Sequence, residues 1–187
     1  MRVLVVAPPA SVVGLTEAKA HLRVRHNVED TLIEAYVAAA TGHIDGPDGW
    51  LGRAIGDQVL EAYADVFHDC MRLPFGPVIE IVSVKYLSGT GDEVTVLPSE
   101  YELRGWLLGS AFGKRWPSVL SHPEAVRIQY RAGYADLPPP IRAAILLMVG
   151  DMYANRETVT VGTGTGATKI PMSTTVQTLL SPFRIFT

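Results

Sequence analysis

The sequence predicts an α+β protein, mainly an α-helical bundle with a small antiparallel β-module inserted between the second and third main helices. Apolar residues recur at helical spacing near both ends of the chain, and a run of β-branched residues with a glycine-containing turn lies between them. Of the 187 residues, 48% are hydrophobic and 19% are charged, so an ordinary core can form. We expect residues 1–56 and 133–187 to form one structural unit, with residues 57–132 as a β-rich insertion.

The first 56 residues are expected to form an N-terminal arm and two helices. The apolar run Val3–Ala7 is too short for a secretory segment and is followed by two prolines, which predicts an extended arm or an edge strand. A short helix is predicted over Leu15–Val24, with Thr16 as its cap. A second helix is predicted from a cap at Asn27 to about Ile44. Its apolar stripe comprises Val28, Leu32, Ile33, Tyr36, Val37, Ala40 and Ile44.

Residues 57–132 carry the strand patterns. Val78–Leu87 is rich in β-branched residues, and the turn Ser88–Asp92 leads into Glu93–Leu97, which together predict a hairpin. Glu100–Leu108 and Ala125–Tyr130 are predicted to add strands. Gln58–Phe67 has a mixed alternation, and Met71–Pro74 is expected to be a short extended piece.

The last part of the chain is expected to hold a central helix, a loop and a docking segment. Three consecutive prolines ending at Pro140 predict the start of the third main helix, which is apolar on most sides and should therefore be central. Residues 158–171 contain a glycine–threonine loop. Ser173 is predicted to cap a last short helix through Leu180, and an apolar tail follows. We expect this tail to dock either on the chain's own core or on a neighbouring subunit.

No residue pattern in the chain indicates catalysis or cofactor binding. The glycines at 162–166 lack the Gly-Lys-Ser/Thr ending of a phosphate-binding loop. His68, Asp69 and Cys70 are adjacent, and no second pair of metal-ligating residues accompanies them, so a loop with a buried or half-buried cysteine is favoured over a metal site. A Gly-x-Ser-x-Gly nucleophile motif is also absent from the sequence. We expect no enzyme activity, no cofactor and no metal.

Charge and aromatic content bear on possible partners. The net charge of −3 and the pI near 5.9 argue against tight, phosphate-driven binding of nucleic acid. A helix-turn-helix is disfavoured because the second helix opens with acidic residues. For Tyr101, Trp106 and Trp116, core packing is favoured, with a role as interface anchor as the alternative.

The single cysteine excludes an internal disulfide, and no apolar run has membrane-spanning length, so a soluble protein made in the cytoplasm is expected.

Several segments resemble a known family. Leu15–Val24 and the acidic helix opening after it resemble the N-terminus of head–tail connector (adaptor) proteins of tailed phages. Tyr130–Tyr134, Pro140–Leu147 and Asn155–Glu157 are similar to the third helix of that family and its flanks, and Leu179–Arg184 is similar to its C-terminal ending. Residues 57–132 resemble the β-rich insertion of its longer members.

The resemblance implies a structural protein of a phage, prophage or gene transfer agent, located at the head–tail junction of the virion and in the host cytoplasm during assembly. It implies a homo-oligomeric ring, usually a dodecamer, that lies under the portal protein and extends the DNA channel. A stopper or tail-terminator protein would bind next, DNA would pass without specific binding, and no membrane would be involved. The competing hypotheses are a DNA-packaging accessory or DNA-binding module, and an enzyme of unrecognised type.

The C-terminal tail is the predicted contact with the portal or a neighbouring subunit. Ordering about ten residues costs on the order of 10 kcal/mol or more, so we expect the surface of a partner to offset this cost. The predicted interface residues are Val176, Leu179, Leu180, Phe183, Arg184 and Phe186. We also expect the residues that face the DNA channel to be acidic or polar.

Overall fold

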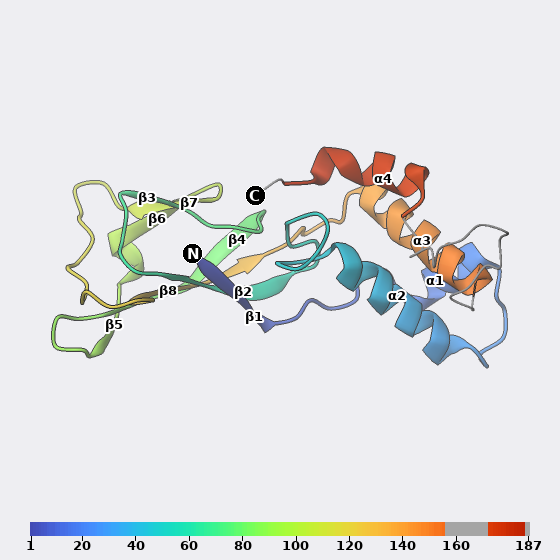
Figure 1. The fold of residues 1–187 in the computed structure, drawn as a ribbon, viewed down its shortest axis with the longest axis horizontal. Coiled ribbons are helices and arrows are strands. Elements are labelled where there is room, and N and C mark those ends of the chain that lie inside the picture. Colours follow the sequence, from blue (N-terminus) through green and yellow to red (C-terminus); the bar gives the residue numbers. More distant parts are fainter. Residues whose placement is uncertain (156–171, 186–187) are drawn as a thin grey trace, which may run out of the picture.

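The computed structural model describes residues 1–155 and 172–185. Helices gather at one end of an elongated molecule and strands at the other (Figure 1). The helices are α1 (Leu15–Leu22), α2 (Asp30–Ile44), α3 (Pro139–Ala154) and α4 (Thr174–Leu180), with short 3-10 turns η1 (Pro98–Glu100) and η2 (Ser181–Phe183). The strands are β1 (Arg2–Ala7), β2 (Gln58–Ala64), β3 (Cys70–Arg72), β4 (Val78–Leu87), β5 (Glu93–Thr95), β6 (Tyr101–Arg104), β7 (Leu107–Ser110) and β8 (Val126–Ala132).

The strands form two antiparallel sheets. The larger has the order β1-β2-β8-β4-β5, and the smaller has the order β3-β7-β6. In the large sheet Tyr130 of β8 lies opposite Leu60 of β2 and Ile81 of β4. The predicted hairpin is present, because β4 pairs with β5 from Lys85 opposite Thr95 to Leu87 opposite Glu93.

The mixed α+β class is confirmed, but a mainly helical bundle with a self-contained β-insertion is not. The N-terminal run forms β1, which pairs with β2 at the edge of the large sheet, as one of the two expected alternatives. The sheet therefore recruits residues from outside 57–132. This pairing is physically favoured because β2 would otherwise present unpaired backbone N–H and C=O groups along one side.

Two groups of buried apolar side chains hold the fold together. The helical core includes Val13, Ala18, Ile33, Val37, Ala40, Ile44, Leu51, Ile55, Ile141, Ala144, Ile145, Met148, Val149, Val176 and Leu180. The sheet core includes Ala54, Leu60, Ala62, Met71, Leu73, Val84, Val96, Leu108, Val126, Ile128, Tyr130 and Ala132. The helix α3 packs against α1, α2 and α4, which confirms its expected central position.

The two cores meet where the chain leaves the large sheet. Gly133 has a φ of +129°, and a Cβ atom there would lie 2.2 Å from the carbonyl oxygen of Gly56. Only glycine permits this close approach of two backbones. Strand β8 therefore passes directly beside the start of β2 before the chain turns into α3.

The helix starts differ in part from the predicted ones. Helix α1 begins after Gly14 rather than at a Thr16 cap, and α2 begins after Glu29 without a side-chain cap. Asn27 instead accepts a hydrogen bond from Lys19 Nζ at 2.7 Å, and Val28 lies before the helix with 91% of its surface exposed. The predicted cap of α4 is present, since Ser173 Oγ accepts a hydrogen bond from the N–H of Val176.

Candidate interaction surfaces

The last helix is docked on the chain's own core. Helix α4 packs against α3, and the side chains of Val176 and Leu180 are fully buried among the helical core residues. Leu179 and Phe183 are half-buried against the same core. The described part of the tail is therefore docked on the chain's own core, and α3 covers Val176 and Leu180 without the partner surface that was expected to be needed.

The residues after α4 continue along the same core toward the sheets. The guanidinium of Arg184 lies 4.2 Å from the ring centre of Trp50, and the N–H of Ile185 donates to the carbonyl of Leu51 at 2.9 Å. Gly52 has a φ of +63°, and a Cβ there would lie 2.8 Å from the carbonyl oxygen of Ile185. The tail therefore fits closely against the loop that joins α2 to β2.

The predicted interface residues divide according to their exposure. Val176 and Leu180 present no surface to a partner in this conformation, because the core covers them. Leu179, Phe183 and Arg184 keep part of their surface exposed. Phe186 lies outside the described residues. A contact of this segment with a portal or a neighbouring subunit stays a prediction, and it rests on the partly exposed side chains.

A buried polar group joins the helical end to the large sheet. Asp45, which follows α2, accepts hydrogen bonds from the N–H of Ile55 at 2.6 Å and from Gln58 Nε2 at 3.0 Å. Gln58, the first residue of β2, is 2% exposed. Burial raises the pKa of the Asp45 carboxyl, and these hydrogen bonds act in the opposite direction. Sequence reasoning missed this pair because it placed Asp45 only in a helix-ending turn.

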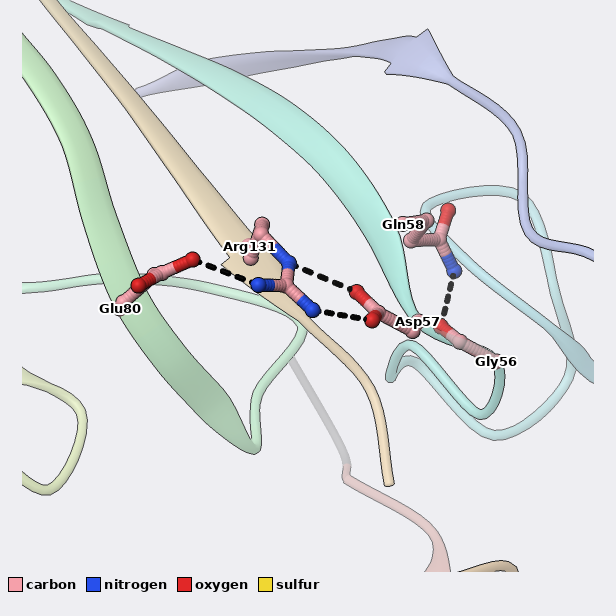
Figure 2. Close-up of polar contacts among 5 residues, drawn as sticks. All are labelled: Gly56, Asp57, Gln58, Glu80 and Arg131. Atoms are coloured by element: carbon pink, nitrogen blue, oxygen red, sulfur yellow. Dashed lines mark hydrogen bonds and ion pairs between the residues drawn. The ribbon is translucent and has the colours of Figure 1, made fainter. Parts of the chain in front are cut away.

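The large sheet carries a second polar group, centred on Arg131 of β8 (Figure 2). We call the solvent-exposed face that carries Arg131 the outer face. Its guanidinium donates to both carboxylate oxygens of Asp57, which precedes β2, and to Glu80 Oε1 of β4 at 2.6 Å. The hydrogen bonds from Arg131 lower the pKa of Asp57, and the two carboxylates raise the pKa of Arg131. Asp57 and Arg131 are 74 positions apart, so only the pairing of β2 with β8 brings them together.

Other basic side chains on this face are also paired with carboxylates. Arg2 of β1 makes two hydrogen bonds to Glu124, at 2.6 and 2.7 Å. Glu93 of β5 lies 2.9 Å from both Lys85 and Arg127. The positive charge on the outer face is thus largely compensated by neighbouring acidic groups.

The aromatic residues of the β-end differ in their environments. Trp116 stacks on Phe67 with ring centres 4.4 Å apart, and Tyr101 is half-buried against the sheet core, in line with the favoured core packing. Trp106 instead is 47% exposed, with the Arg72 guanidinium 4.9 Å from its ring centre. Phe112, which sequence reasoning did not single out, is 99% exposed in the turn after β7. Trp106 and Phe112 therefore have free apolar surface.

Only some of the candidates for chemistry lie among the described residues. Cys70 is exposed at the start of β3, where the alternation of the strand buries Met71 instead, so the expected loop with a covered cysteine is wrong. The glycine run at 162–166 lies outside the described residues. Within residues 1–155 and 172–185, no three His, Cys, Asp or Glu side chains gather as metal ligands. Across the same residues, no helix combines the length and apolarity needed to cross a membrane.

Comparison with known proteins identifies the fold. No family model matches the chain, and no curated protein matches it. Among solved structures, the fold is similar to that of protein chains in gene transfer agent particles, and specifically in their necks. A chain from the neck of an empty particle computed with C6 symmetry superposes with a TM-score of 0.76 and 20% identity, covering 100% of this chain and 97% of that one.

Two further structures give the same result. A chain from the virion of a native gene transfer agent particle has a TM-score of 0.76 and 20% identity, with coverage of 100% and 97%. A chain from the neck of a native particle computed with C12 symmetry has a TM-score of 0.69 and 18% identity, with the same coverage. The expected resemblance to a connector at the head–tail junction is confirmed at the level of the fold.

Proposed function

We propose that this chain is a structural head–tail connector, which forms a ring at the neck of a phage-like particle and extends its DNA channel. The observation that carries the proposal is the full-length likeness to chains from gene transfer agent necks, at a TM-score of 0.76. Those necks were computed with C6 and C12 symmetry, which is the arrangement expected of identical subunits around a channel.

The charge distribution supports a protein that lets DNA pass without binding it. Arg2, Arg127 and Arg131 on the outer sheet face are engaged by carboxylates, and the chain as a whole has a net charge of −3. Binding to the phosphate backbone requires cations that can replace counterions, and compensated cations do so poorly. This distribution gives no support to the alternative of a DNA-binding or packaging accessory module.

The proposed partners are the portal on one side of the ring and a stopper or tail-terminator protein on the other. For the portal contact we propose the partly exposed residues of the tail, Leu179, Phe183 and Arg184, together with Phe186. Arg184 and Phe183 lie at the end of the molecule's last helical segment, where exposed surface remains available to a second protein.

The test compares particle assembly in two strains: one that produces the chain and one from which its gene has been deleted. We expect purified particles to contain the chain by mass spectrometry and to show it as a ring at the neck by electron microscopy. Deletion of the gene should leave DNA-filled heads without attached tails. Tailed, infectious or transducing particles from the deletion strain would contradict the proposal.

A further inference from the structure

One stripe of the exposed face of α2 carries only small residues, although Thr31, Glu34 and His43 of the same helix are also exposed. Ala35, Ala38, Ala39 and Gly42 are all exposed and follow one another at steps of three, one and three, so they form one stripe along two turns of the helix. A helix face that stays in water normally carries long charged side chains. We call these four residues the α2 ridge.

Gly42 gives the ridge a feature that the isolated chain does not need. A Cβ atom built at Gly42 would meet no atom within 4 Å, so the chain's own packing leaves room for a side chain. Glycine inside a helix costs about 1 kcal/mol relative to alanine. The packing of the isolated chain therefore gives no reason for a glycine at this position.

The ridge runs between two mostly apolar hollows. On one side a hollow of about 430 Å³ is bounded by Ala38 and Gly42 and, across from them, by Pro9 and Val13. On the other side a hollow of about 270 Å³ is bounded by Ala39 and, across from it, by Met148 and Met152 of α3. A helix of another molecule could pack along this ridge, because its side chains could enter the apolar hollows on the two sides.

The larger hollow also contains an unsatisfied polar group. Thr41 lines it and is 8% exposed, and its hydroxyl has no hydrogen-bond partner among residues 1–155 and 172–185. A buried hydroxyl without a partner costs about 1–3 kcal/mol. The Thr41 hydroxyl oxygen is itself covered, so its side chain would have to rotate toward the hollow before an occupant with a polar group could remove that cost.

We infer that the α2 ridge is the surface on which a second copy of this chain packs in the assembled ring. The inference rests on the proposed function, because the similar chains belong to necks computed with C6 and C12 symmetry, where each copy lies beside another. A ring contact joins two different surfaces of the subunit, so one copy offers the ridge and its neighbour a different face. Close approach of a neighbouring backbone requires small residues, which the ridge supplies.

The test uses arginine variants that preserve the monomer. Ala38→Arg combined with Gly42→Arg places two long cations on the ridge, and arginine has a helix propensity close to that of alanine. Ala20→Arg, at an exposed position of α1, is the matched control. As monomers, we expect the control to melt like the wild type and the ridge variant to melt at the same or a higher temperature, because Gly42→Arg removes a glycine from the helix. In particles, the ridge variant should be incorporated at least about tenfold less than the wild type, whereas the Ala20→Arg control should be incorporated normally.

A photo-crosslinking residue at position 38 identifies the occupant directly. In purified particles we expect adducts that join two copies of this chain, as shown by mass and by peptide sequencing. Adducts to a different protein, or normal incorporation of the ridge variant, would overturn the inference while leaving the connector function intact. If the wild-type chain is missing from the particles, the proposed function fails and the inference fails with it.

Discussion

Two carboxylates near the start of β2 respond to pH in opposite directions. Asp45 is held among the residues that join the helical end to the sheet, and burial raises its pKa. Asp57 lies at the surface, and hydrogen bonds from Arg131 lower its pKa. The stabilisation linked to Asp45 is therefore complete at low pH and declines as the pH rises through the raised pKa. The stabilisation linked to Asp57 is complete above the unfolded-state pKa and is lost as the pH falls through the lowered one.

Replacing Asp45 should lower the unfolding free energy of the protein substantially. Asp45→Ala removes the acceptor for the N–H of Ile55 and for the buried amide of Gln58, so we expect a loss of about 2–4 kcal/mol in unfolding free energy. Urea titrations should show a larger difference from the wild type at about pH 4 than at pH 7, because ionisation of Asp45 weakens its contribution. The control Asp48→Ala, at an exposed position, should stay within about 0.5 kcal/mol. Equal effects of the two substitutions would contradict this role.

The ion pairs of Arg131 should contribute little to the stability of the folded protein. The side chain of Arg131 is 38% exposed and that of Asp57 is 48% exposed, so solvent screens their interaction. Arg131→Met keeps the aliphatic stem and should cost less than about 1 kcal/mol at pH 7. The difference from the wild type should shrink in about 1 M salt and as the pH falls through the pKa of Asp57. A loss that is large and independent of salt would show that packing, not charge, is the source.

At the scale of elements, α4 has one side packed in the helical core and one side exposed. Its inner side chains complete the helical core against α3, while Thr174, Thr175, Gln177 and Thr178 face outward. The helix has seven residues, too few to be stable alone in water, so its order comes from this packing.

Leu180→Ala tests whether α4 belongs to the core of the free chain. Leu180 is fully buried, so the substitution should lower the unfolding free energy by about 2–5 kcal/mol in a urea titration of the isolated protein. Gln177→Ala, on the exposed side of the same helix, serves as the control and should change it by less than about 0.5 kcal/mol. If Leu180→Ala left the isolated protein unchanged and impaired only particle assembly, the tail would belong to the interface instead.

Local patterns predicted elements well where neighbouring residues determine the structure. The hairpin of β4 and β5 and the cap at Ser173 depend on residues a few positions apart, and both were predictable. The predicted cap at Asn27 is wrong because α2 begins only after Glu29, and the side chain of Asn27 instead accepts a hydrogen bond from Lys19 of α1. The partner of β1 and the ion pair of Arg131 with Asp57 depend on which strands pair, and periodicity carries no information about that choice. The α2 ridge could not be predicted from the sequence, because alanine is common in helices and does not by itself indicate a contact surface.

At the scale of the whole molecule, acidic charge and paired cations should prevent DNA binding. We expect no retarded band for double-stranded DNA at about 0.15 M salt, with protein at up to about 10 µM. The double variant Asp57→Ala with Glu80→Ala releases Arg131 and should bind DNA measurably better at low salt. Strong retardation by the wild-type protein that weakens steeply with added salt would favour the DNA-binding alternative.

The chain crosses between the helical end and the sheet end three times: after β1, after α2 and after β8. Gly56 and Gly133 hold two of these crossings in contact, and Ile185 bonds back to the second. Under the proposed connector function, a load that pulls the helical end away from the sheet end would be divided among these three chain segments. We therefore expect the junction between the two ends to stretch little, and, under the same proposal, bending of a neck to arise between subunits rather than within them.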